Sequence, residues 1–267
     1  MSGRRCLAVG GTDVRIPDTM RALPLLVLLI AGAFPALASS QAADVTFESG
    51  PRRTRLLELY TSEGCSSCPP AEAWLSKLKD HPGLWREFVP LAFHVDYWDR
   101  LGWRDPFAAK AWTARQYDYS ARWKNGSVYT PGFVLDGREW RNDGVPSAAS
   151  DSPGTLKVSI VGGDAVSAAY APAVSDNKPL ELHVARLGFD LNTNVKAGEN
   201  RGRKLLHDFV VIDLRSTKMS DGKAELRVTP NVAAPQQPGT RSAFAAWVTA
   251  PGELEPIQAV GGWLQER

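Results

Sequence analysis

Two cysteines separated by only two serines, Cys65 and Cys68, lie between segments of opposite periodicity. The segment before them, residues 55–60, is a short apolar run that predicts a buried strand. The segment after them, residues 69–80, predicts a helix, because apolar side chains recur there at helical spacing: Ala71, Trp74, Leu75 and Leu78. The cysteine pair is therefore expected where a strand gives way to a helix.

The following residues continue this alternation of strands and helices. Residues 88–95 predict a second buried strand, and Asp105 is expected to cap a second helix that starts at the proline after it. The runs 131–135 and 138–141, separated by Asp-Gly, predict a terminal hairpin. Residues 51–145 are therefore predicted to form an α/β domain with a partly parallel sheet.

Beyond residue 154 the sequence changes character. Short apolar runs are separated by Gly, Asn, Asp and Pro, and they lie at residues 156–161, 166–170, 180–187, 209–214, 224–228, 244–249 and 257–264. Many short strands with turn signals between them are typical of an all-β fold. Residues 155–267 are therefore predicted to form a second, β-sandwich-like domain.

Residues 1–38 have the layout of a secretory signal peptide. An arginine follows Met20, an apolar run covers residues 25–34, and Ala-Leu-Ala at 36–38 provides a cleavage site. The apolar run is short for a bilayer span, which disfavours the alternative of a retained membrane anchor. We expect Met20 to be the true start, the location to be secreted or periplasmic, and no stable membrane anchor to remain after cleavage.

The charge balance bears on the class of partner. The chain has 31 basic and 29 acidic residues, so it lacks the positive field that attracts nucleic acid, and no nucleic-acid partner is expected. Removal of the signal peptide takes away Cys6 and leaves Cys65 and Cys68 in a compartment where disulfides persist.

A cysteine pair at the start of a helix is suited to redox chemistry. The positive helix end stabilises a thiolate, so Cys65 is expected to have a lowered pKa, to be within reach of outside peptides and to act as nucleophile. Cys68 is then placed to resolve the mixed disulfide. Thr130 and Pro131 precede an apolar strand, where a cis proline would offer backbone groups to a substrate. Glu58 is either a proton acceptor buried beneath the pair or an edge carboxylate in water.

Other interpretations of the pair stay open. A structural disulfide closing so short a loop contributes only about 2 kcal/mol in the chain-entropy account. A zinc ribbon would need a second pair of ligands at a matching spacing. Two thiolates and an imidazole suit copper, so Cys65, Cys68 and His94 form the alternative metal set. A third alternative is a non-catalytic protein that binds a partner through its β domain.

Several separated motifs occur in a fixed order along the chain: 59–70 (LYTSEGCSSCPP), 93–98 (FHVDYW), 102–107 (GWRDPF), 115–116 (RQ), 129–131 (YTP) and 198–202 (GENRG). Together they resemble the secreted family catalogued as domain of unknown function 1223, over roughly residues 54–264. That resemblance implies a thioredoxin fold for the first domain. It also implies that Cys65 and Cys68 hold the dithiol positions and Pro131 the cis-proline position.

The sequence thus predicts an α/β thioredoxin-like domain followed by an all-β sandwich-like domain. The predicted function is a secreted or periplasmic thiol-disulfide oxidoreductase that requires no cofactor. Its substrates would be protein thiols and disulfides, or a redox partner protein. Its site residues would be Cys65, Cys68, Pro131 and Glu58, with Thr130 on the substrate side.

Overall fold

The computed structural model describes residues 10–11, 44–124, 126–141, 144–175, 178–228 and 240–264. The predicted signal peptide, apart from Gly10 and Gly11, lies outside the described residues. Among the helices that the structure describes, none combines the length and the apolar character needed to cross a membrane.

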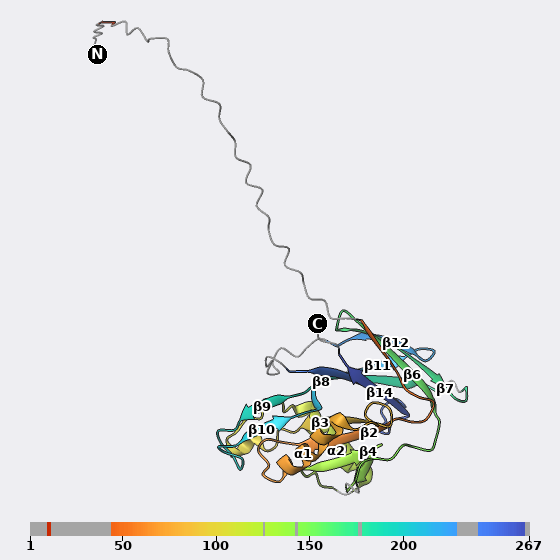
Figure 1. Ribbon diagram of the computed structural model, residues 1–267, viewed down its shortest axis with the longest axis horizontal. Coiled ribbons are helices and arrows are strands. Elements are labelled where there is room, and N and C mark those ends of the chain that lie inside the picture. The colour runs from red at the N-terminus through yellow and green to blue at the C-terminus, as the bar shows by residue number, and fades with distance from the viewer. Residues whose placement is uncertain are drawn as a thin grey trace, which may run out of the picture. The chain divides into compact units, whose positions relative to one another are not determined.

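A mixed sheet of eight strands runs through the molecule (Figure 1). Its strands, in spatial order, are β14 (Gln258–Trp263), β13 (Ser242–Thr249), β8 (Leu180–Gly188), β11 (Val210–Met219), β3 (Phe88–His94), β2 (Arg55–Thr61), β4 (Gly132–Leu135) and β5 (Arg138–Trp140). The pairs β2–β3 and β3–β11 are parallel, and the other pairs are antiparallel.

The pairing of β3 with β11 corrects the predicted fold class. Ala92 of β3 is in register with Val210 of β11, and the Ala92 amide donates to the carbonyl oxygen of Phe209 at 2.8 Å. The strands of the two predicted domains therefore belong to one sheet. The expectation of an α/β thioredoxin-like domain followed by an all-β sandwich-like domain is wrong, because strands dominate the described residues and only two α-helices accompany them. An unpaired edge of β3 would leave buried backbone groups without partners, and β11 satisfies them.

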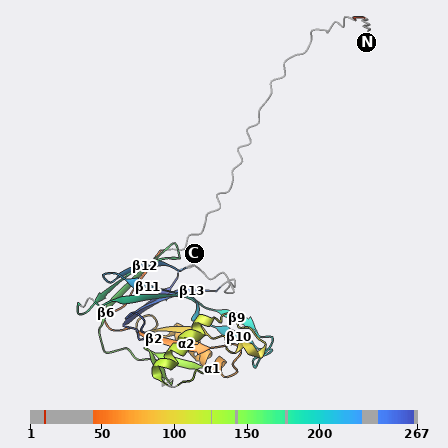
Figure 2. The same ribbon diagram turned by 180° about the vertical axis from the view of Figure 1, so that it is seen from behind.

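A second sheet packs against one end of the first, away from the helices (Figures 1 and 2). Its order is β1 (Val45–Glu48), β6 (Gly154–Val161), β7 (Ala165–Pro172) and β12 (Lys223–Arg227). Alternate side chains of β13 explain how both faces of the large sheet are buried. Phe244, Ala246 and Val248 join the core beneath the second sheet, whereas Ala243, Ala245 and Trp247 join the core that includes β2 and β3.

Two α-helices lie beside the strands β2, β3 and β4 (Figure 1). Helix α1 (Cys68–Ser76) continues into the 3-10 helix η1 (Lys77–Asp80), and α2 spans Lys110–Trp123, after the short 3-10 helix η2 (Asp99–Leu101). The predicted start of the second helix is wrong, since α2 has Ala109 as its N-cap. Asp105 is instead buried, with its side chain bonded to a histidine and to two backbone amides.

A small hairpin absent from the sequence prediction lies next to α1 (Figure 1). It consists of β9 (Leu191–Asn194) and β10 (Lys204–His207), paired antiparallel. Residues 195–203 connect the two strands and are called here the 195–203 loop. This loop and β10 bring residues from the second half of the chain to the cysteine pair.

Candidate functional site

The cysteine pair lies in the turn between β2 and α1, as the sequence predicts. Strand β2 ends at Thr61, Ser67 is the N-cap of α1, and Cys68 is the first residue of that helix. The Cys68 amide donates to the carbonyl oxygen of Cys65 at 3.2 Å, which closes the turn. Both cysteines are free thiols in the structure.

Two oxygen atoms lie close to the sulfur of Cys65. The Sγ atom lies 3.2 Å from the hydroxyl oxygen of Ser67 and 3.6 Å from the carbonyl oxygen of Thr130. The hydrogen bond with Cys68 is the largest cause that lowers the pKa of Cys65, with further lowering from Ser67, and the result is a pKa of about 6. At neutral pH most of the Cys65 side chain is therefore in the thiolate form.

Cys68 has the opposite environment. Burial raises the pKa of its thiol well above the ordinary range, and the hydrogen bond that it donates to Cys65 raises it further. The two sulfurs are thus unequal, with a thiolate at Cys65 and a protonated thiol at Cys68. This is the division expected of an attacking and a resolving cysteine.

Thr130 and Pro131 lie beside the cysteine turn. Their peptide bond is cis, and the Thr130 carbonyl faces Cys65 Sγ. The indole nitrogen of Trp98 donates to the Thr130 hydroxyl at 2.8 Å. A Cβ atom added to Gly64 would lie 2.7 Å from Trp98 Cβ, so glycine at this position permits the close approach of the indole to the turn.

The accessibility of Cys65 differs from the expectation of an exposed sulfur. Cys65 is only 1% exposed, although Ser66 and Ser67 are exposed. The 195–203 loop contacts this turn, since the Glu199 carboxylate accepts a hydrogen bond from the Ser66 amide at 2.9 Å. The side-chain amide of the fully buried Asn200 donates to the carbonyl oxygens of Glu63 and Cys65, both at 2.9 Å.

Glu58 is buried, but its partners are not the cysteines. Its carboxylate forms a bidentate ion pair with Arg115, with distances of 2.8 and 2.9 Å. The hydroxyl groups of Tyr60 and Tyr119 donate to the same carboxylate at 2.8 and 2.7 Å. The edge carboxylate in water is thereby excluded, and the contacts of Glu58 are those of a structural ion pair rather than of a proton acceptor for Cys68.

A second group of polar residues lies behind the cysteine turn and was not predicted as a unit. Glu63, Glu72, His94, Asp105 and His207 are all buried and are linked by hydrogen bonds. Burial alone lowers the pKa of His207, but Glu72 and Glu63 outweigh it and raise this pKa to about 10.

The position of His94 bears on the alternative copper set, in which this histidine was combined with Cys65 and Cys68. Its closest polar neighbours are Asp105 and the group that contains Glu72 and His207, so His94 is not grouped with Cys65 and Cys68. One sequence signal could have indicated Glu72, which follows Cys68 by one helical turn and so lies on the same helix face. Asn200 lies within the GENRG motif at residues 198–202, but neither this motif nor the sequence around His207 indicates a contact with the cysteine turn.

The strand-rich fold and the buried cysteine turn define a mixed-sheet protein with a Cys-x-x-Cys pair between a parallel strand and a helix. The family described as "Protein of unknown function (DUF1223)" matches residues 56–249. The chain belongs to this family.

Two solved structures are similar over most of the described fold. One is protein AGR_C_4864 from Agrobacterium tumefaciens, with 24% identity and a TM-score of 0.51 over 80% of this chain and 94% of that one. The other is HBP35 of Porphyromonas gingivalis, with 14% identity and a TM-score of 0.51 over 80% of this chain and 76% of that one. At these identities the likeness concerns the fold alone. A comparison with curated proteins found no match.

Proposed function

We propose that this protein is a secreted or periplasmic thiol-disulfide oxidoreductase whose redox centre is the Cys65–Cys68 pair. The observation that carries the proposal is the inequality of the two thiols: the pKa of Cys65 is lowered to about 6, whereas that of Cys68 is raised. A structural thiol pair has no need of this inequality. Thiol–disulfide exchange requires unequal thiols, because the attacking sulfur must be a thiolate at the pH at which the protein works.

The proposed reaction has two steps. The Cys65 thiolate attacks one sulfur of a substrate disulfide, forms a mixed disulfide and releases the other substrate sulfur as a thiolate. Cys68 then loses its proton and attacks Cys65 Sγ, which forms the Cys65–Cys68 disulfide and releases the second substrate thiol. Two electrons pass from the protein dithiol to the substrate, and an external dithiol must reduce the protein again. The reverse sequence oxidises a substrate dithiol.

Substrate access requires a local movement, since Cys65 is buried in the described conformation. The exposed Ser66 and Ser67 cover the turn, and Glu199 holds the Ser66 amide from outside. Release of this contact, together with the hydrogen bonds that Asn200 of the same loop donates to the turn, would open the turn. The carbonyl of Thr130, next to the sulfur, is then available to position an extended peptide.

The proposed location rests on the amino-terminal sequence. The arginine after Met20, the apolar run and the Ala-Leu-Ala segment are features of a cleaved export signal. The proposed partners are protein thiols and disulfides, or a redox partner protein, in that compartment. Fractionation of cells that express the full chain tests this location, and retention of uncleaved chain in the cytoplasm contradicts it.

An insulin-reduction assay tests the proposed activity, with wild type compared to Cys65→Ser, Cys68→Ser and the matched control Ser66→Ala. We expect activity in wild type and Ser66→Ala, no activity in Cys65→Ser, and accumulation of a mixed disulfide on Cys68→Ser. Equal activity in wild type and Cys65→Ser contradicts the proposal, because the activity would then not depend on this cysteine. No activity in any protein, including wild type with reductant present, also contradicts it and favours the non-catalytic alternative.

A further inference from the structure

Two buried histidines are each held by a carboxylate at one ring nitrogen. His94 Nδ1 lies 2.8 Å from an oxygen of Asp105, and His207 Nε2 lies 2.9 Å from an oxygen of Glu63. All four side chains are at most 2% exposed. A carboxylate behind an imidazole fixes the orientation of the ring and makes its other nitrogen a better electron-pair donor.

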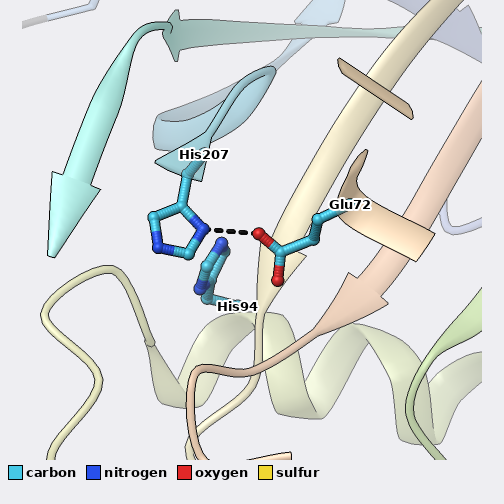
Figure 3. A group of neighbouring side chains, drawn as sticks. All are labelled: Glu72, His94 and His207. Carbon is cyan, nitrogen blue, oxygen red and sulfur yellow. Dashed lines mark hydrogen bonds and ion pairs between the residues drawn. The ribbon is translucent and has the colours of Figure 1, made fainter. Parts of the chain in front are cut away.

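The other nitrogens of these rings converge on Glu72 (Figure 3). His207 Nδ1 is hydrogen-bonded to one oxygen of Glu72, and the ring nitrogen of His94 that lies farther from the backbone points toward both residues. One ligand atom from each of Glu72, His94 and His207 lies within 4.8 Å of the others. The second oxygen of Glu72 is fixed by the Thr61 hydroxyl at 2.6 Å.

His94 Nε2 is the unexplained atom of this group. It is buried and has no hydrogen-bond partner among the residues that the structure describes. A buried polar atom without a partner is costly, because it has lost its hydration and gained nothing in exchange. With Nδ1 bound to Asp105, the free Nε2 lone pair is aimed at the space between Glu72 and His207.

The charges of the group also favour a bound cation. Glu63, Glu72 and Asp105 are three buried carboxylates, and their ion-pair partners are the two imidazoles. Buried charges are ordinarily paired or bound to metals. A divalent cation between the carboxylates would balance their charge, and both imidazoles would bind it in their neutral form.

We propose that Glu72, His94 Nε2 and His207 Nδ1 bind one divalent transition-metal ion, with Asp105 and Glu63 as the carboxylates that orient the two histidines. Two imidazoles and one carboxylate are a ligand set that zinc and related metals use in proteins. The ion would take the place of the hydrogen bond between His207 Nδ1 and Glu72. The site contains neither cysteine, and it differs from the copper set considered from the sequence.

The ion would join three separate elements of the fold. Glu72 belongs to α1, His94 to β3 and His207 to β10. Only β10 comes from the second half of the chain, and it carries the 195–203 loop next to the cysteine turn. A metal ion at this position would therefore fasten the β9–β10 hairpin to the elements that hold the cysteine pair.

Metal binding to the full chain tests the proposal, in wild type and in a variant with Cys65→Ser and Cys68→Ser. Each protein is dialysed against Zn²⁺ and then against buffer, and bound zinc is measured by elemental analysis. We expect one equivalent in both proteins and a higher Tm that falls when a chelator is added. The double variant loaded with Co²⁺ should show visible absorption bands typical of a cobalt ion bound by nitrogen and oxygen ligands.

Point variants assign the ligands. His94→Gln and His207→Gln are expected to lower the affinity for Zn²⁺ at least about 100-fold, and Asp105→Asn about 10- to 100-fold, as an orienting carboxylate does. The matched control is His183→Gln. His183 is also buried, but both of its nitrogens are bonded, to Ser216 and Thr249, so this variant should keep one equivalent of zinc.

Some results would overturn the proposal. They are no bound Zn²⁺ or Co²⁺ in wild type and in the double variant, loss of binding in the double variant alone, or unchanged binding in the His94 and His207 variants. Should the histidine variants not fold, the Co²⁺ spectrum of the double variant decides by itself. Because that variant has no redox thiols, the result is independent of the proposed oxidoreductase activity.

Discussion

Asn200 Nδ2 lies 2.9 Å from the carbonyl oxygen of Cys65, although the two residues are 135 positions apart. The same amide nitrogen donates to the carbonyl of Glu63, and Arg203 donates to the Asn200 side-chain oxygen at 2.7 Å. One buried side chain thus fixes the backbone on either side of Gly64. The conformation of the cysteine turn therefore depends on the 195–203 loop.

Replacement of Asn200 by alanine should loosen the cysteine turn. Asn200→Ala removes the side-chain donor of the buried Glu63 carbonyl, and a buried group left unsatisfied costs about 1–3 kcal/mol. It also removes one of the two donors of the Cys65 carbonyl, which keeps its hydrogen bond from the Cys68 amide. We expect a lower free energy of unfolding in urea and faster alkylation of Cys65 in the native protein. Asn194→Ala, at an exposed position of the same hairpin, is the control and should change neither quantity. Unchanged alkylation in Asn200→Ala would show that the loop does not restrict Cys65.

The reactivity of Cys65 should follow a low pKa. With a pKa of about 6, the thiolate is largely formed at neutral pH, and it is protonated as the pH falls through that value. The alkylation rate should therefore be flat above pH 7 and fall about tenfold per pH unit well below 6. Thiolate ultraviolet absorbance, as the difference between wild type and Cys65→Ser, gives the same midpoint.

Cys68→Ala should raise this midpoint, because the hydrogen bond from Cys68 is the largest cause that lowers the pKa of Cys65. A midpoint near the ordinary cysteine value of about 8.5 in wild type would remove the main support for the proposed chemistry.

A side chain at Gly64 should disturb the contact between the turn and Trp98. The Cβ of Gly64→Ala would lie 2.7 Å from Trp98 Cβ, which forces the turn and the indole apart. Overpacking of this kind costs about 1–3 kcal/mol, measurable by urea unfolding. Gly50→Ala is the matched control, because nothing lies within 4 Å of a Cβ there and its backbone needs no positive φ. Similar losses in both variants would contradict the steric explanation.

The ion pair of Glu58 with Arg115 should matter for stability. Arg115→Met leaves a buried carboxylate without its cation, which costs about 3–5 kcal/mol of unfolding free energy. Combining it with Glu58→Gln should restore part of the loss, since the stranded charge is then removed. Arg122→Met, on the same helix, breaks an ion pair with Glu253 that is largely exposed and should cost about 0–1 kcal/mol. A double variant less stable than Arg115→Met would contradict this account.

Local periodicity was a good guide to single elements. The runs at 55–60, 88–95 and 180–187 correspond to β2, β3 and β8, and the Asp-Gly dipeptide joins β4 to β5. The helix after the cysteines is α1 extended by η1. The start of α2 was placed too early, because the Asp105 carboxylate is used by His94 and by two backbone amides rather than by a helix terminus.

The sequence by itself determined many of the strands and helices, although not β1, the β9–β10 hairpin or the start of α2, and it determined that Cys65 and Cys68 lie between a strand and a helix. These features depend on neighbours within a few positions, whose side chains decide the local backbone. Only the tertiary structure decided that β11 extends the sheet beyond β3, that Asn200 reaches the cysteine turn, and that His94 and His207 meet at Glu72. These contacts join distant segments, and which segments meet depends on the pairing of whole strands and the packing of buried side chains.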